Sequence, residues 1–68
     1  MDESHHLGSV LLKMLADRGV TKAQFARDCK MSRQWVQEIC GRSNWHTTTL
    51  MRVCRTLDVS PLELLPKP

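Results

Sequence analysis

The sequence contains no run of apolar residues long enough to cross a membrane, because a spanning helix needs about 18 in succession. Its first residues are acidic, and Lys13 and Asp17 interrupt the first apolar stretch, so a signal peptide is not expected either. No segment alternates between apolar and polar residues as a half-buried strand would, and no internal repeat is visible. We therefore expect an all-α domain without a membrane partner.

The three cysteines include no CxxC pair, and their odd number argues against a disulfide framework or a structural zinc site. We expect Cys29, Cys40 and Cys54 to be small buried apolar residues in a reducing compartment. Zinc held by these thiols and His46 is the less favoured alternative. No metal or other cofactor is therefore expected.

Groups that could perform catalysis are not arranged in any familiar pattern. The chain has no nucleophile–base set, no paired catalytic carboxylates and no phosphate-binding glycine loop. A chain of 68 residues buries only about 60% of its unfolded surface, which leaves no room for an elaborate active site. An enzyme is therefore not expected, whereas the net charge of +3 suits an anionic partner such as nucleic acid.

The apolar residues that are present recur at helical spacing. They predict a first helix over residues 7–18, which Gly19 ends in a left-handed conformation. A second helix is expected over residues 21–29, with Thr21 as its N-cap and Gln24 completing a capping box.

Two further serines mark helix beginnings. Ser32 is expected to cap a third helix that ends at Cys40, and a fourth helix begins at residue 47 or 48 and ends at residue 57. Ser60 and Pro61 predict a short fifth helix, because proline suits the first helical position.

The second and third helices carry the pattern that indicates function. Two short helices joined by a tight turn need a small residue midway along the first helix and apolar residues at fixed offsets around it. Ala26 is the small residue. The apolar residues around it are Phe25, Cys29, Met31, Val36 and Ile39.

The segments TKAQFARDCKMSRQWVQEICGR and LMRVCRTLDVSPLELL resemble the Cro and C1 repressor family, also called the XRE family. The resemblance covers residues 7–65. It implies a compact five-helix bundle that binds double-stranded DNA in the cytoplasm at the nucleoid, in a protein that is prokaryotic or encoded by a phage or plasmid. Residues 1–6 would then be a flexible N-terminus and residues 66–68 a short tail.

Three positions depart from the family pattern. Lys30 stands where a glycine is usual, so either the turn differs locally or a left-handed lysine costs about 1 kcal/mol. Leu15 and Cys40 replace an arginine–glutamate pair by two apolar residues, an exchange that is often neutral or stabilising. Gly41 comes one residue early, which leaves the path of the following loop open.

The resemblance implies that the N-terminal end of the third helix enters the major groove. Arg33 would donate two hydrogen bonds to guanine, and Gln34 or Gln37 would pair with adenine. Trp35 either packs against a neighbouring helix or touches a thymine methyl group or the sugar–phosphate edge.

Contacts to the DNA backbone are expected from helix N-termini and from the loop after the third helix, where N–H groups and cations meet phosphates. These residues are Thr21, Lys22, Ser32, Arg42, Ser43, Asn44, His46, Thr47 and Thr48. Four other basic residues are expected on solvated helix faces, namely Lys13, Arg18, Arg52 and Arg55, and Trp45 is expected to cover the core.

Family members usually bind palindromic sites as dimers. The expected homodimer interface consists of Met51, Val59, Pro61, Leu62 and Leu65. The implied function is a small transcriptional regulator, favoured as a repressor. Two alternatives stay open: an antitoxin that also sequesters a toxin or another protein partner, and a protein-interaction module that kept the fold without DNA binding.

Overall fold

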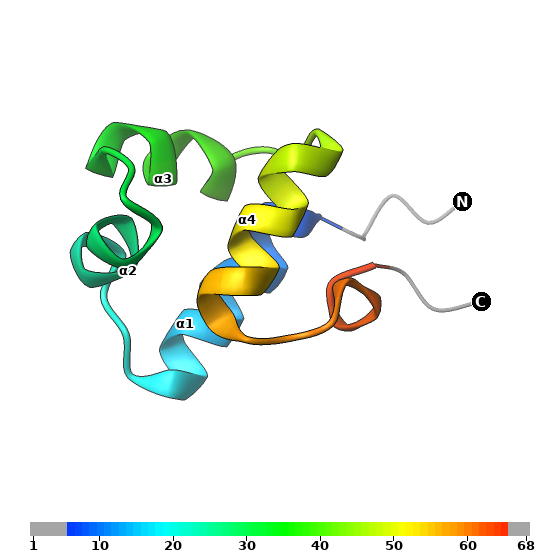
Figure 1. Ribbon diagram of the computed structural model, residues 1–68, viewed down its shortest axis with the longest axis horizontal. Helices are drawn as coiled ribbons and strands as arrows, with labels where there is room; N and C mark the ends of the chain where they lie inside the picture. The colour runs from blue at the N-terminus through cyan, green and yellow to red at the C-terminus, as the bar shows by residue number, and fades with distance from the viewer. Residues whose placement is uncertain (1–5, 66–68) are drawn as a thin grey trace.

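The computed structural model describes residues 6–65 and contains four α-helices followed by a short 3-10 helix, with no strand in that range (Figure 1). The α-helices pack around one core, with α2 against α3 and α4, and α1 against α3. None of the helices in these sixty positions is long and apolar enough to span a membrane. The elements are α1 (Leu7–Arg18), α2 (Lys22–Cys29), α3 (Arg33–Cys40), α4 (Thr47–Leu57) and η1 (Pro61–Glu63).

The all-α class and the bounds of the four α-helices are confirmed, but the expectation of a fifth α-helix is wrong. Ser60 caps the segment as predicted, and Pro61 occupies the first position of η1. The backbone then makes short-range bonds from Glu63 to Ser60 and from Leu64 to Pro61, which is 3-10 geometry. Pro66 in the sequence disfavours the α conformation at the residue before it, so too few residues remain for an α-helix.

Local capping chemistry sets where the helices begin. The Thr21 hydroxyl accepts a hydrogen bond from the Gln24 backbone N–H at 3.1 Å, and the Ser32 hydroxyl accepts one from the Trp35 N–H at 3.0 Å. At α1 the cap is His6, whose Nδ1 accepts from the Ser9 N–H at 3.1 Å. The rest of the segment expected to be flexible, residues 1–5, and the tail at residues 66–68 lie outside the described residues.

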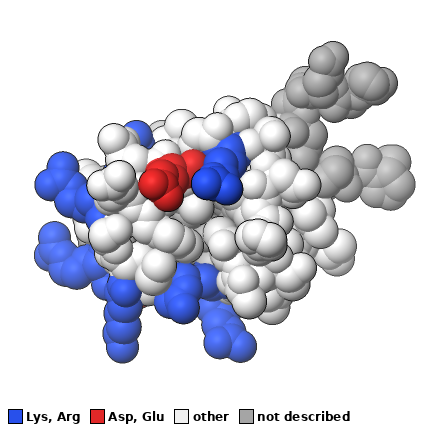
Figure 2. Space-filling view, turned by 90° about the horizontal axis from the view of Figure 1, so that it is seen from above, with Lys and Arg blue, Asp and Glu red and all other residues white. Residues whose placement is uncertain are grey.

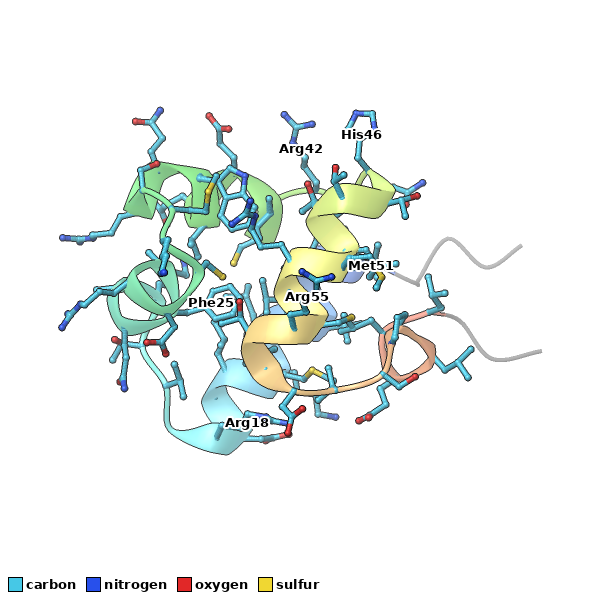
Figure 3. The ribbon with its side chains drawn as sticks, viewed as in Figure 1. Arg18, Phe25, Arg42, His46, Met51 and Arg55 are labelled. Carbon is cyan, nitrogen blue, oxygen red and sulfur yellow. The ribbon has the colours of Figure 1, made fainter. Side chains whose placement is uncertain are left out.

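The predicted helix-turn-helix core is confirmed. Phe25 is fully buried at its centre (Figure 3). Val36 is fully buried as well, and Met31 is half-buried against the same core. Leu15 and Cys40 are both buried in the same cluster, so this core contains apolar side chains where the family often has an ion pair. The other buried members of the predicted set are Ala26, Cys29 and Ile39.

Left-handed residues end three of the helices. Gly19 has φ 68°, as predicted, and Asp58 has φ 58°. Lys30 ends α2 with φ 61°, so the turn keeps its usual shape and the lysine carries the conformational cost of about 1 kcal/mol. Gly41 has φ −92°, an ordinary value, so its early position in the sequence needs no special backbone conformation.

Glycine at position 8 allows α1 to cross very close to the end of α3. A Cβ atom there would lie 2.8 Å from the Ile39 carbonyl oxygen and would overlap the carbonyl group of Cys40. The close approach lets the Leu7 and Gly8 N–H groups donate to the carbonyls of Ser43 and Arg42, at 3.1 and 2.9 Å. The first turn of α1 therefore holds the loop after α3. The sequence interpretation missed Gly8, although a glycine inside an expected helix is a signal of close packing.

Two of the arginines expected on solvated faces also contact the end of another helix. Arg18 Nη1 donates to the Leu57 carbonyl at 3.0 Å, and Arg52 Nη1 donates to the Cys29 carbonyl at 3.1 Å. Carbonyls in the last turn of a helix have no partner within the helix, so these long side chains satisfy them from another helix. Arg18 and Arg52 are exposed, as expected, and each also makes this contact between helices.

The buried thiols predict a pH dependence of stability. Burial raises the pKa of Cys29, Cys40 and Cys54 above the ordinary value of 9.0. A thiol whose pKa is higher in the folded state stabilises the fold fully below the unfolded-state pKa. That contribution is lost as the pH rises through the folded-state pKa.

We therefore expect the free energy of unfolding, measured in urea, to fall as the pH is raised from about 8 through 9 and beyond. A variant with alanine at all three positions should show a smaller fall over the same range. Equal slopes in the two proteins would contradict the prediction.

Candidate nucleic-acid interface

The third helix turns its polar side chains outward. Arg33, Gln34 and Gln37 are exposed, while the opposite side of α3 is buried in the core through Val36, Ile39 and Cys40. Residues three and four positions apart share a helix face, so these three of the predicted base-reading side chains lie together. Arg33 and Gln34 stand in the first turn of α3, at the end expected to enter the groove.

The beginning of α2 lies next to this face. Lys22 Nζ donates a hydrogen bond to Gln37 Oε1 at 3.1 Å, which joins the first residue of α2 to the middle of α3. A shallow hollow follows the junction of the two helices. It is lined by Lys22, Ala23, Arg33, Gln34, Gln37 and Glu38.

The loop from residue 41 to 46 and the start of α4 continue the same surface. Arg42 and His46 point to the same side of the molecule, beyond α3 and the first turn of α4 (Figure 3). Within residues 6–65, His46 provides no side-chain hydrogen bond as the N-cap of α4. The exposed first turn at Thr47 and Thr48 therefore offers N–H groups to an anion.

All nine residues expected to touch the DNA backbone are exposed, but several of them also make hydrogen bonds within the protein. The hydroxyls of Thr21 and Ser32 cap their own helices, and Asn44 Oδ1 accepts from the Trp45 N–H at 3.0 Å. The exposed set is Thr21, Lys22, Ser32, Arg42, Ser43, Asn44, His46, Thr47 and Thr48.

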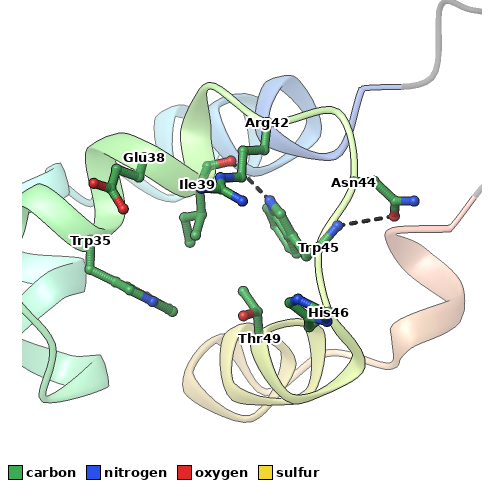
Figure 4. A pocket seen from close by; sticks show the side chains of 8 residues that line it. All are labelled: Trp35, Glu38, Ile39, Arg42, Asn44, Trp45, His46 and Thr49. Atoms are coloured by element: carbon green, nitrogen blue, oxygen red, sulfur yellow. Dashed lines mark hydrogen bonds between the residues drawn. The ribbon is translucent and has the colours of Figure 1, made fainter.

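Two tryptophans lie between α3 and α4 (Figure 4). Trp45 is half-buried against the core, as expected, and its Nε1 donates to the Ile39 carbonyl at 2.9 Å. Trp35 is also half-buried against the core and points from α3 towards α4. This position favours the packing interpretation of Trp35 over base contact. The hollow between the helices is also lined by Glu38, Ile39, Arg42, Asn44, His46 and Thr49.

Charge is distributed unevenly over this surface. Figure 2 looks down on the upper side of Figure 1, where α3 and the start of α4 lie. Lysine and arginine side chains gather at the left and lower edges of the view. The centre is mostly uncharged, with one acidic side chain beside a basic one. Cations at an edge suit phosphates, and uncharged polar groups at a centre suit base edges.

Three of the five residues expected at a dimer interface are exposed, and the other two are half-buried. Leu62 is 75% exposed, Met51 40% and Leu65 37%. Val59 and Pro61 are half-buried, and Val59 packs against the core.

No three metal-ligating side chains come together among the described residues. Each cysteine is a separate free thiol buried in the core. Cys29 Sγ donates to the Thr56 hydroxyl at 3.2 Å, a contact within the protein. The arrangement suits packing rather than coordination.

Comparison with known protein families matches residues 10–66 to the Cro/C1-type HTH DNA-binding domain. Neither curated proteins nor solved structures gave a match. The family match includes α2, the left-handed turn at Lys30 and α3, with the outward-facing side chains described above. The chain therefore belongs to the Cro/C1-type helix-turn-helix family of DNA-binding domains.

Proposed function

We propose that the protein is a sequence-specific transcriptional repressor that binds palindromic double-stranded DNA as a homodimer. The observation that carries the proposal is the shared outward face of Arg33, Gln34 and Gln37 on α3, opposite a fully packed core. An eight-residue helix exposing one arginine and two glutamines can form the bidentate pairs that distinguish bases in the major groove.

The surfaces around α3 support a docked duplex. The first turns of α2 and α4, and the loop that carries Arg42, would contact phosphates on either side of the groove. These contacts position α3 without reading sequence. Because phosphate contacts release counterions, we expect the affinity to fall steeply between about 50 and 200 mM salt.

A second copy would double the number of base pairs read. Leu62, Leu65 and Met51 are large apolar side chains that remain exposed in the single chain. We place the homodimer contact on these three residues, with Val59 and Pro61 beside them. Two recognition helices about one DNA turn apart would then face the two halves of a palindrome.

Arg33 provides the test of base reading. Duplexes bound from a random pool should show a clear preference at one position, and Arg33→Ala should lose it. The affinity for the selected duplex should fall by about 5- to 150-fold, the value of one bidentate pair. Arg55→Ala is the matched control, because it removes the same charge from a side chain on another side of the molecule (Figure 3).

Equal loss of affinity for the selected duplex in Arg33→Ala and Arg55→Ala would contradict the proposal. So would the absence of binding to any duplex at low salt. The latter would favour a protein-interaction module with this fold. Copurification of a neighbouring toxin would instead favour an antitoxin.

A further inference from the structure

The Lys22–Gln37 hydrogen bond determines which way the Gln37 amide faces. Lys22 Nζ lies 3.1 Å from Gln37 Oε1. A lysine ammonium has three N–H donors and no acceptor, so the amide atom that faces it has to be the oxygen. The amide nitrogen of Gln37, with two N–H donors, is therefore turned away from Lys22.

This orientation changes what Gln37 can read. A glutamine whose amide group can rotate freely recognises adenine by donating to N7 and accepting from the N6 amino group. The bond holds the Gln37 oxygen towards α2, so a base edge that approaches from the side away from Lys22 meets the two N–H donors of the amide. Guanine offers two acceptors there, N7 and O6, whereas the amino group of adenine would meet another donor.

We propose that Lys22 is a specificity-determining residue that acts through Gln37, so that Gln37 selects guanine over adenine. The proposal rests on the proposed function, because it requires α3 in the major groove. It replaces the expectation that Gln37 pairs with adenine. Lys22 keeps two further N–H donors and can still contact a phosphate, so it would connect the DNA backbone to the base contact.

The Lys22–Gln37 hydrogen bond is strong enough to change the preference between guanine and adenine, but it contributes only a small part of the total affinity for DNA. Both side chains are exposed in the free protein, where water competes for the bond. A duplex bound against α3 would exclude that water. A hydrogen bond with a charged donor is stronger where water is excluded, because the local dielectric constant is lower. The typical net value of one protein hydrogen bond corresponds to a shift of about 3- to 10-fold in base preference, and we expect a shift of this size because both side chains are exposed.

The test is selection of bound duplexes from a random pool by the whole chain and its variants. Gln37→Ala first identifies the position that Gln37 reads, as the position where preference is lost. At that position the unchanged protein should select guanine. Lys22→Met should lower the guanine-to-adenine ratio by about 3- to 10-fold, and Lys22→Arg, which keeps the charge and the donors, should preserve it.

Arg42→Met is the matched control. It removes one cation from the same expected phosphate contacts. Within residues 6–65, the hydrogen bond to the Gln37 side chain comes from Lys22 and not from Arg42. Arg42→Met should weaken binding to all duplexes while the guanine-to-adenine ratio stays unchanged. In the Gln37→Ala background, Lys22→Met should no longer alter any base preference.

The outcomes separate this proposal from the proposed function. If Lys22→Met weakens all duplexes equally and keeps the guanine-to-adenine ratio, Lys22 is a phosphate contact only and the proposal is wrong. Selection of adenine by the unchanged protein at the Gln37 position also overturns it. If the unchanged protein selects no sequence at all, the proposed function itself fails. Melting curves confirm that each variant is folded, as expected for exposed side chains.

Discussion

Replacing Gly8 with alanine should lower the free energy of unfolding by about 2 kcal/mol. Forcing a Cβ atom against the carbonyls of Ile39 and Cys40 costs about 3 kcal/mol, because backbone atoms cannot turn aside as a side chain can. Alanine is the better helix former by about 1 kcal/mol, which offsets part of this loss. In a domain of this size the melting temperature should fall by about 8–16 °C.

Gly41→Ala is the control for this prediction. Gly41 has φ −92°, and a Cβ atom there would lie 3.7 Å from the nearest carbonyl oxygen, an ordinary contact. Alanine should therefore leave stability unchanged or raise it by about 0.4–1 kcal/mol, since it restricts the unfolded chain. Similar melting temperatures for Gly8→Ala and the unchanged protein would show that α1 does not cross α3 as closely as described.

The Gly8 substitution should also affect DNA binding in the molecules that remain folded. The Leu7 and Gly8 N–H groups hold the carbonyls of Ser43 and Arg42, and Arg42 is an expected phosphate contact. Moving α1 away would release this loop. We expect weaker binding to every duplex and a shallower salt dependence, while base preference is retained.

Phe25→Ala should cost about 3–5 kcal/mol, the usual loss when a fully buried aromatic side chain is truncated. Phe25 is 0% exposed and lies among the helices at the centre of the molecule (Figure 3). A chain of 68 residues has a total stability of only about 3–10 kcal/mol. Urea denaturation at 25 °C should therefore show a protein that has lost a large part of its stability, or all of it.

Phe25→Leu keeps most of the apolar volume and should remain folded. If both variants bind the selected duplex in proportion to their folded fraction, Phe25 acts through the fold alone. Full stability of Phe25→Ala would contradict the packing described.

Much of the fold and of the candidate interface was predictable because the signals are local. Thr21 and Ser32 cap helices through bonds to residues three positions away, and the buried stripe on α3 repeats with the turn of the helix. The same repeat places Arg33 on the opposite, exposed side. The fifth helix was predicted wrongly because cap and proline signals mark where a helical segment starts but not how long it continues.

Contacts between distant parts of the chain needed the tertiary structure. Arg18 reaches the end of α4, and Arg52 reaches the end of α2. Neither partner can be inferred from helical periodicity. The bond from Trp45 to the Ile39 carbonyl likewise depends on how the loop returns towards α3.

Residue order and side-chain chemistry were enough to establish four amphipathic helices, the N-caps of α2 and α3 and the outward placement of Arg33, Gln34 and Gln37. These properties depend on interactions within a few positions along the chain. How closely α1 crosses α3 at Gly8, and which atom of Gln37 faces Lys22, depended on the packed helices. A crossing distance and an amide orientation arise from atoms brought together only after the chain has folded.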